Sequence, residues 1–218
     1  MREDVIVIFR QLLLAWGKEN FQPFPWRNID DPYLVLLSEF LLHRTQARQV
    51  IPIYEKLAIL YPDLASFCTA DKDTVRQLLN PLGLGWRIDG LIDTFHEIYE
   101  TSGRVPADYD TLISYRTIGP YIAGATVCFS SNKPVELVDV NIVRVTGRVF
   151  GLSLEGEARR RKPMIAAIEA ACDPDSPRAY YYAVIDLAHK LCRPSTPLCQ
   201  DCPLRQLPCA YYSQMNLI

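Results

Sequence analysis

Long apolar segments are absent from this 218-residue sequence, and so is a recognisable export signal. No run approaches the roughly 20 consecutive apolar residues of a membrane-spanning helix. The opening segment MREDVIVIFRQLLLAWGKEN is partly apolar, but Arg10 and Gln11 interrupt it, so it does not resemble a secretory signal. We therefore expect a cytoplasmic protein with no membrane partner.

An excess of positive charge is also missing. The formal net charge is −2, with 49% hydrophobic and 22% charged residues, which is ordinary for a soluble globular protein. If the chain binds nucleic acid, its positive potential must be local. The length suits one domain or two small lobes, and we expect a monomer.

Patterns typical of β-sheet are scarce. Apolar residues recur at helical spacing in most segments, beginning with residues 3–17. Residues 32–50 are apolar nearly all round, which predicts one buried helix. The apolar run Val135–Val138 is too short and isolated to build a sheet. The sequence therefore predicts an all-α fold of about ten short helices.

One carboxylate interrupts the apolar stretch LVLLSEFLL, at Glu39. An ionised carboxylate is costly to bury without partners and tends to become neutral instead. Either Glu39 is neutralised by a structural partner, or its protonation state has a use.

Cysteines are concentrated near the C-terminus. Four of the seven follow the spacing C-x6-C-x2-C-x6-C and are Cys192, Cys199, Cys202 and Cys209. Without an export signal, this pattern favours metal binding over disulfides. One tight C-x2-C pair between two wide spacings favours a [4Fe–4S] cluster, whereas zinc ribbons usually have two tight pairs. Zinc, or free or disulfide-bonded cysteines, are the alternatives. The remaining cysteines are expected in the core: Cys68, Cys128 and Cys172.

Two glycine turns precede predicted helices. In TLISYRTIGPYIAGATV, Gly119 lies in the turn and Pro120 begins the next helix; NPLGLGWR contains Gly83 and Gly85. Amides at a helix N-terminus suit a phosphate, so both turns could bind a nucleic-acid backbone independently of sequence. Ordinary helix-loop-helix connections are the alternative.

Asp139, in VELVDVNIVRV, follows an apolar run and precedes a helix. It is either an ordinary N-cap or a carboxylate kept ionised at the wall of a pocket. The basic segment EARRRKP at 157–163 is interpreted as a solvated helix start rather than a binding site.

Taken together, these segments resemble the helix-hairpin-helix DNA glycosylases of the endonuclease III superfamily. The matching motifs occur in family order over nearly the whole chain: FPWR at 24–27, SEFLLHRTQA at 38–47, PLGLGWR at 81–87, TIGPYIAGA at 117–125, VDVNIVRV at 138–145, and the cysteine loop. The resemblance implies a six-helix barrel lobe at 28–135. A second lobe comprises 1–27 and 136–218, with a [4Fe–4S] loop at 192–209. The target base would be flipped into a cleft between the lobes.

The resemblance also implies roles for three residues. Asp139 corresponds to the catalytic aspartate, which stabilises the cationic sugar or activates its nucleophile. Glu39 matches a glutamate that donates a proton or positions water in the adenine and mismatch-thymine branches. Tyr121 replaces the Schiff-base lysine of bifunctional members and is similar to the mismatch-thymine branch; a phenol cannot form that intermediate.

DNA contacts follow from the same resemblance. The wedge that fills the gap of the flipped base is expected at Arg44, Thr45 or Gln46, and Asn141 and Arg144 are expected to brace the Asp139 turn. The hairpin departs from the family because Thr117 occupies the place of its first glycine. Phosphate contacts are expected at the remaining turn positions: Gly83, Gly85, Thr117 and Gly119.

The sequence thus predicts a monofunctional DNA glycosylase, without efficient AP-lyase activity, that acts on double-stranded DNA. Its expected substrate is thymine or uracil opposite guanine. An adenine DNA glycosylase lacking the C-terminal domain that reads 8-oxoguanine is one alternative, and a non-catalytic DNA-binding module is the other.

Overall fold

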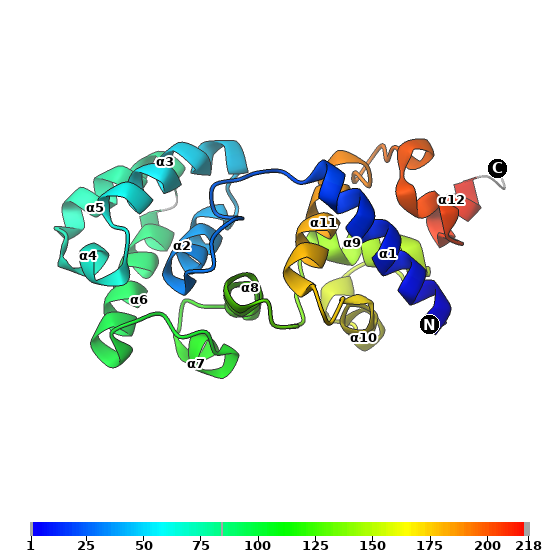
Figure 1. The fold of residues 1–218 in the computed structure, drawn as a ribbon. Helices are drawn as coiled ribbons and strands as arrows, with labels where there is room; N and C mark the ends of the chain where they lie inside the picture. The colour runs from blue at the N-terminus through cyan, green and yellow to red at the C-terminus, as the bar shows by residue number, and fades with distance from the viewer. Residues whose placement is uncertain (1, 84, 216–218) are drawn as a thin grey trace. The chain divides into compact units, whose positions relative to one another are not determined.

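The computed structural model describes residues 2–83 and 85–215, and every regular element in these residues is a helix. This confirms the predicted all-α class. Figure 1 shows the chain, which divides into two compact units: Met1–Gln22 with Asn132–Ile218, and Pro23–Ser131. The resemblance predicted lobe boundaries at residues 28 and 135, which lie a few residues beyond the observed boundaries at Pro23 and Ser131. Within the described residues, no helix is long and apolar enough to cross a membrane.

The continuous unit begins at Pro23 and contains these helices: α2 (Pro32–Leu42), α3 (Ala47–Leu60), α4 (Leu64–Thr69), α5 (Lys72–Leu79), α6 (Gly85–Ser102), α7 (Tyr109–Ser114) and α8 (Pro120–Ser131). Helix α2 begins at Pro32 because Asp31 caps it, with Oδ1 accepting from the amides of Tyr33 (2.9 Å) and Leu34 (3.0 Å). Helix α2 packs mainly against α8 and α3, and it therefore lies in the core of this unit.

The predicted single helix over residues 32–50 is wrong. Helix α2 ends at Leu42 and α3 begins at Ala47, with a short turn between them. Arg44 in this turn has a φ of 60°, the left-handed conformation that L-residues rarely adopt and that a helix cannot contain. The apolar pattern continues across the turn because α2 is buried nearly all round and α3 buries one face, so periodicity did not reveal the break.

The discontinuous unit combines the N-terminal helix with the C-terminal part of the chain: α1 (Glu3–Asn20), α9 (Val140–Phe150), α10 (Lys162–Ala171), α11 (Pro177–Lys190) and α12 (Ala210–Met215). Helix α1 packs along α11. Gly17 permits this close approach, because a Cβ there would lie 2.6 Å from the Cβ of Ala183. A long-range helix pair thus joins the two ends of the sequence into one core.

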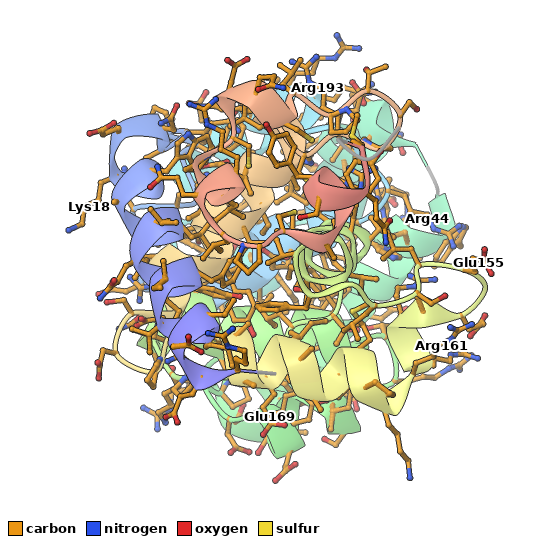
Figure 2. The ribbon with its side chains drawn as sticks, turned by 90° about the vertical axis from the view of Figure 1, so that its right-hand side faces the viewer. Lys18, Arg44, Glu155, Arg161, Glu169 and Arg193 are labelled. Carbon is orange, nitrogen blue, oxygen red and sulfur yellow. The ribbon has the colours of Figure 1, made fainter. Side chains whose placement is uncertain are left out.

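The basic segment at 157–163 forms a short 3-10 helix, Ala158–Arg160, and the start of α10. Arg160 pairs with Glu157 at 2.8 Å in an exposed position. Glu155 and Arg161 also lie at the surface of this unit (Figure 2). This arrangement agrees with a solvated helix start.

Candidate active site and cysteine centre

Asp139 caps the N-terminus of α9. Its Oδ1 accepts a hydrogen bond from the amide of Ile142 at 2.7 Å, and its Oδ2 accepts from Nδ2 of Asn141 at 2.9 Å. The side chain is half-buried. The N-cap interpretation is therefore confirmed, and the two donors fix the orientation of the carboxylate at the start of α9.

A chain of hydrogen bonds links the Asp139 turn to the cysteine segment. Nη2 of Arg144 donates to Oδ1 of Asn141 at 2.9 Å and to the carbonyl of Ala188 at 3.1 Å. Nε of Arg144 donates to the carbonyl of Cys192 at 2.8 Å. Burial lowers the pKa of Arg144. The orientation of Asp139 thus depends, through two side chains, on where the first cysteine lies.

Glu39 lies on α2 in the other unit and is 6% exposed. Its helix is buried along almost its entire length, including the neighbouring residues Leu36, Leu37, Ser38, Phe40 and Leu41. The apolar setting inferred from the sequence is therefore present in the folded protein.

The helix-hairpin-helix segment consists of α7, a turn and α8. Pro120 begins α8 as predicted, and Tyr121 is half-buried in its first turn. A Cβ at Gly119 would meet open space, so the backbone there is accessible to a ligand. In contrast, the hydroxyl of Thr117 forms a hydrogen bond with the hydroxyl of Thr94 on α6. Thr117 therefore anchors the hairpin to α6 through its side chain.

The second glycine turn joins α5 to α6. Gly83 has a φ of 71°, and Gly85 begins α6; a Cβ at either position would meet open space. Residue 84 lies outside the described residues. The indole of Trp86 is 64% exposed, whereas the next side chain, Arg87, is buried. The turn thus presents accessible backbone beside an exposed aromatic ring.

Arg87 contacts the turn between α2 and α3, where the wedge is expected. Its Nη1 donates to the carbonyl of His43 and, at 3.0 Å, to Oγ1 of Thr45. Arg44 is exposed, and Gln46 is the residue that precedes α3. Sequence reasoning missed Arg87, because the contact joins residues more than 40 positions apart.

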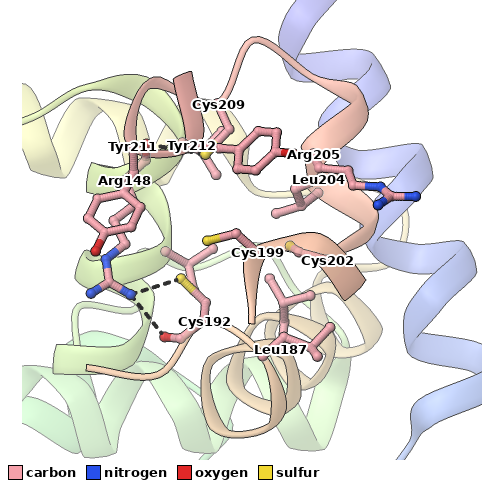
Figure 3. Close-up of a pocket in the computed structure, with 13 residues that line it drawn as sticks. Arg148, Leu187, Cys192, Cys199, Cys202, Leu204, Arg205, Cys209, Tyr211 and Tyr212 are labelled. Atoms are coloured by element: carbon pink, nitrogen blue, oxygen red, sulfur yellow. Dashed lines mark hydrogen bonds between the residues drawn. The ribbon is translucent and has the colours of Figure 1, made fainter. Parts of the chain in front are cut away.

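The four C-terminal cysteines line one cavity, of about 30 Å³ (Figure 3). All seven cysteines lie in described residues, and none forms a disulfide. Burial raises the pKa of Cys202 to about 12 and also raises the pKa of Cys199 and Cys209, with neighbouring cysteines adding to each shift. Among the described residues, no group of three or more Cys, His, Asp or Glu side chains has the geometry to hold a metal ion.

Arg148 connects both ends of this cysteine segment. Its Nη1 lies 3.4 Å from the sulfur of Cys192 and donates to the carbonyl of Arg193 at 2.6 Å, while Nη2 donates to the carbonyl of Pro194 at 2.7 Å. The guanidinium lies 4.5 Å from the ring centre of Tyr211. A buried cation beside four cysteines matches the negative charge that thiolates carry when they bind a metal. Four cysteine sulfurs line this cavity, and thiolates are the ligands that zinc and iron–sulfur clusters take in proteins.

The predicted residues fall into two groups. The structure brings together Asp139, Asn141, Arg144 and the cysteines in the discontinuous unit. The continuous unit contains the others: Glu39, Arg44, Thr45, Gln46, Gly83, Gly85, Thr117, Gly119 and Tyr121. Cys128 and Cys172 are buried, as the sequence predicted. Cys68, which was also expected in the core, is half-buried.

Comparison with known proteins identifies the class. The fold matches a thermostable thymine-DNA glycosylase with a TM-score of 0.89 and 28% identity, covering 97% of this chain and 98% of that one. It also matches endonuclease III in a non-covalent DNA complex, with a TM-score of 0.78 and 16% identity over the full length of both chains. The fold and the ordered motifs therefore define a helix-hairpin-helix DNA glycosylase.

Two relatives show to which family within this class the chain belongs. The chain is 33% identical to the thymine-DNA glycosylase of Aeropyrum pernix, covering 95% of this chain and 96% of the relative. It is 30% identical to the thymine/uracil-DNA glycosylase of Pyrobaculum aerophilum, covering 96% and 94%. No protein-family model matches the sequence. The chain belongs to the family of the thymine-DNA and thymine/uracil-DNA glycosylases, which confirms the resemblance found from its motifs.

Proposed function

We propose that the protein binds double-stranded DNA as a monomer and removes thymine or uracil mispaired with guanine. The reaction is hydrolysis of the bond between the base and C1′ of deoxyribose. The observation that carries the proposal is the geometry of Asp139, whose carboxylate is fixed by hydrogen bonds at 2.7 and 2.9 Å in a chain of this family.

Asp139 supplies the negative charge that the reaction requires. As the base departs, the sugar becomes electron-poor and resembles an oxocarbenium ion, which a fixed carboxylate stabilises. Water then adds to C1′ and passes a proton to the Asp139 carboxylate, leaving an abasic deoxyribose and the free base. Asn141 and Arg144 act as positioning residues, because they hold the carboxylate without contacting the reacting atoms.

Glu39 supplies the proton. The departing pyrimidine leaves as an anion unless it is protonated, and burial of a carboxyl group favours its neutral, donating form. The buried position of Glu39 on α2, at 6% exposure, supports this assignment. The two carboxylates thus divide the reaction, with Asp139 stabilising charge and Glu39 delivering the proton.

Tyr121 makes strand cleavage inefficient, because a phenol cannot form a Schiff base with the abasic sugar. Tyr121→Lys should therefore gain a covalent adduct with DNA that borohydride traps, while the parent protein gives none. Trapping of the parent protein would contradict this assignment.

The two glycine turns and the turn at residues 43–46 would contact DNA. Accessible backbone at Gly83, Gly85 and Gly119 supports phosphate binding, which positions the protein without reading sequence. Arg44, Thr45 and Gln46 would enter the gap left by the flipped base. Thr117 contributes through its contact with Thr94, which fixes the hairpin.

The cysteine segment would hold a [4Fe–4S] cluster through Cys192, Cys199, Cys202 and Cys209. Bound there, the cluster would be structural, fixing a loop near the DNA, and hydrolysis requires no redox step from it. Iron and sulfide analysis with absorbance near about 400 nm tests this proposal. Cys202→Ser should lose the colour and Cys172→Ser should keep it; a colourless parent with stoichiometric zinc would overturn it.

A duplex panel tests the assigned substrate. Single-turnover excision is measured on matched duplexes that contain G·T, G·U, A·G or A·8-oxoguanine. We expect base release from G·T and G·U, and cleavage confined to the adenine substrates would replace this assignment with the adenine alternative. Binding without release from any duplex, unchanged in Asp139→Asn, would instead identify a non-catalytic module.

A further inference from the structure

The turn between α2 and α3 has a conformation that its sequence does not favour. Arg44 has a φ of 60°, although glycine, asparagine and aspartate tolerate this region better than arginine does. Within the turn, the amide of Thr45 donates to the carbonyl of Leu42 at 3.1 Å. A strained backbone of this kind persists only where surrounding contacts enforce it.

The contacts that surround Arg44 come from Arg87, which lies in the first turn of α6. Its side chain is 6% exposed, and its Nη1 donates to the carbonyl of His43 and to Oγ1 of Thr45 at 3.0 Å. These two acceptors lie on either side of Arg44 in the sequence. His43 is the C-cap residue of α2, and a cation is favourable at the C-terminus of a helix.

We propose that Arg87 is a positioning residue that holds Arg44 in its left-handed conformation and thereby keeps the turn at 43–46 ready to enter DNA. The inference rests on the proposed function, since it assigns the turn to the strand gap. Arg87 contacts the turn from below the surface and acts through the backbone of Arg44.

The test measures local opening of DNA separately from base removal. A G·T duplex with 2-aminopurine beside the mismatch becomes more fluorescent when the stack opens. At saturating protein, Arg87→Met should lower this signal and reduce single-turnover excision about tenfold, with affinity for matched duplex unchanged. Arg104→Met, at an exposed arginine beyond the other end of α6, controls for the lost charge.

A double-mutant cycle with Arg44→Asn distinguishes positioning from a general effect, because asparagine accepts the left-handed conformation more readily. The loss caused by Arg87→Met should shrink to about twofold in the Arg44→Asn background. An equal loss in both backgrounds, or a folded Arg87→Met protein that behaves like Arg104→Met, overturns the inference.

A milder substitution serves as a control in case Arg87→Met does not fold. Thr45→Val removes the hydroxyl that accepts from Arg87 at 3.0 Å and nearly keeps the side-chain volume. It should lower the fluorescence signal to a value between those of the parent and Arg87→Met, and no change would count against the inference. If the parent opens the mismatch but releases no base, the proposed function fails while the role of Arg87 is still measured.

Discussion

The two carboxylates assigned to catalysis differ in how the fold treats them. Asp139 is half-buried at a helix N-terminus and accepts two hydrogen bonds, whereas Glu39 is 6% exposed in the middle of an apolar helix. Two hydrogen-bond donors fix the orientation of the Asp139 carboxylate, whereas Glu39 lies on a helix that is buried along almost its entire length. The comparison teaches that one chemical group can serve two roles when its surroundings differ, and that the two side chains should not be interchangeable.

The largest effect is expected at Asp139. Asp139→Asn keeps an oxygen that can accept from the amide of Ile142, so the helix cap is preserved, but it removes the negative charge that we propose stabilises the sugar. Single-turnover excision should fall by about 10³-fold or more, with duplex affinity retained. Asp175→Asn, at an exposed position, is the charge control; comparable rates for the two variants would remove Asp139 from the mechanism.

Glu39→Gln should have the next largest effect, about 10²-fold, because glutamine fills the same space but cannot deliver a proton. In the parent protein the excision rate should fall at high pH, as the proton donor is deprotonated, and Glu39→Gln should abolish this fall. The exposed Glu55→Gln on α3 is the control. A Glu39→Gln protein with the pH profile of the parent would leave Glu39 a structural residue.

Arg144→Met should cost about tenfold in excision. Its loss removes the hydrogen bonds to Oδ1 of Asn141 and to the carbonyls of Cys192 and Ala188, while Arg148 still donates to the carbonyl of Cys192 at 3.4 Å. Asp139 should therefore lose orientation rather than charge. Arg144→Lys keeps the charge and should restore part of the rate. If lysine and methionine behave identically, the fork of hydrogen bonds is not what positions Asp139.

The smallest effect is expected at Tyr181, which supports the segment leading to Asp139. Its hydroxyl donates to the carbonyl of Val135 at 2.8 Å and accepts from the amide of Leu137 at 3.3 Å. Tyr181→Phe should lower unfolding free energy by about 1–2 kcal/mol and excision only a few-fold. Urea denaturation and single-turnover kinetics check both values; a loss as large as that of Arg144→Met would contradict this ranking.

Local chemistry explains why the sequence predicted much of the fold. The starts of α2, α8 and α9 are marked by Asp31 with Pro32, by Pro120 and by Asp139, since caps and prolines act within one turn. The six-residue helices α4 and α12 were not predicted, although α7, of the same length, was. The break at residues 43–46 was missed because the apolar pattern continues across it.

The site was predicted unevenly for the same reason. The links from Asp139 to Asn141 and Arg144 are local, and the family resemblance pointed to all three residues. Arg148 was missed, although its spacing of four residues from Arg144 places both on one face of α9 and was a usable signal. The inward contact of Thr117 depends on Thr94, a tertiary partner that no local pattern indicates.

Direct detection of the released base tests the central claim, that this protein is a hydrolytic glycosylase dependent on Asp139. A G·T duplex is incubated with the parent protein and with Asp139→Asn, and free thymine and abasic sites are quantified by mass spectrometry. The account predicts equal amounts of thymine and abasic site from the parent, in an intact strand that breaks only in alkali, and neither product from the variant. Thymine release that persists in Asp139→Asn, or a parent that releases none, would contradict it.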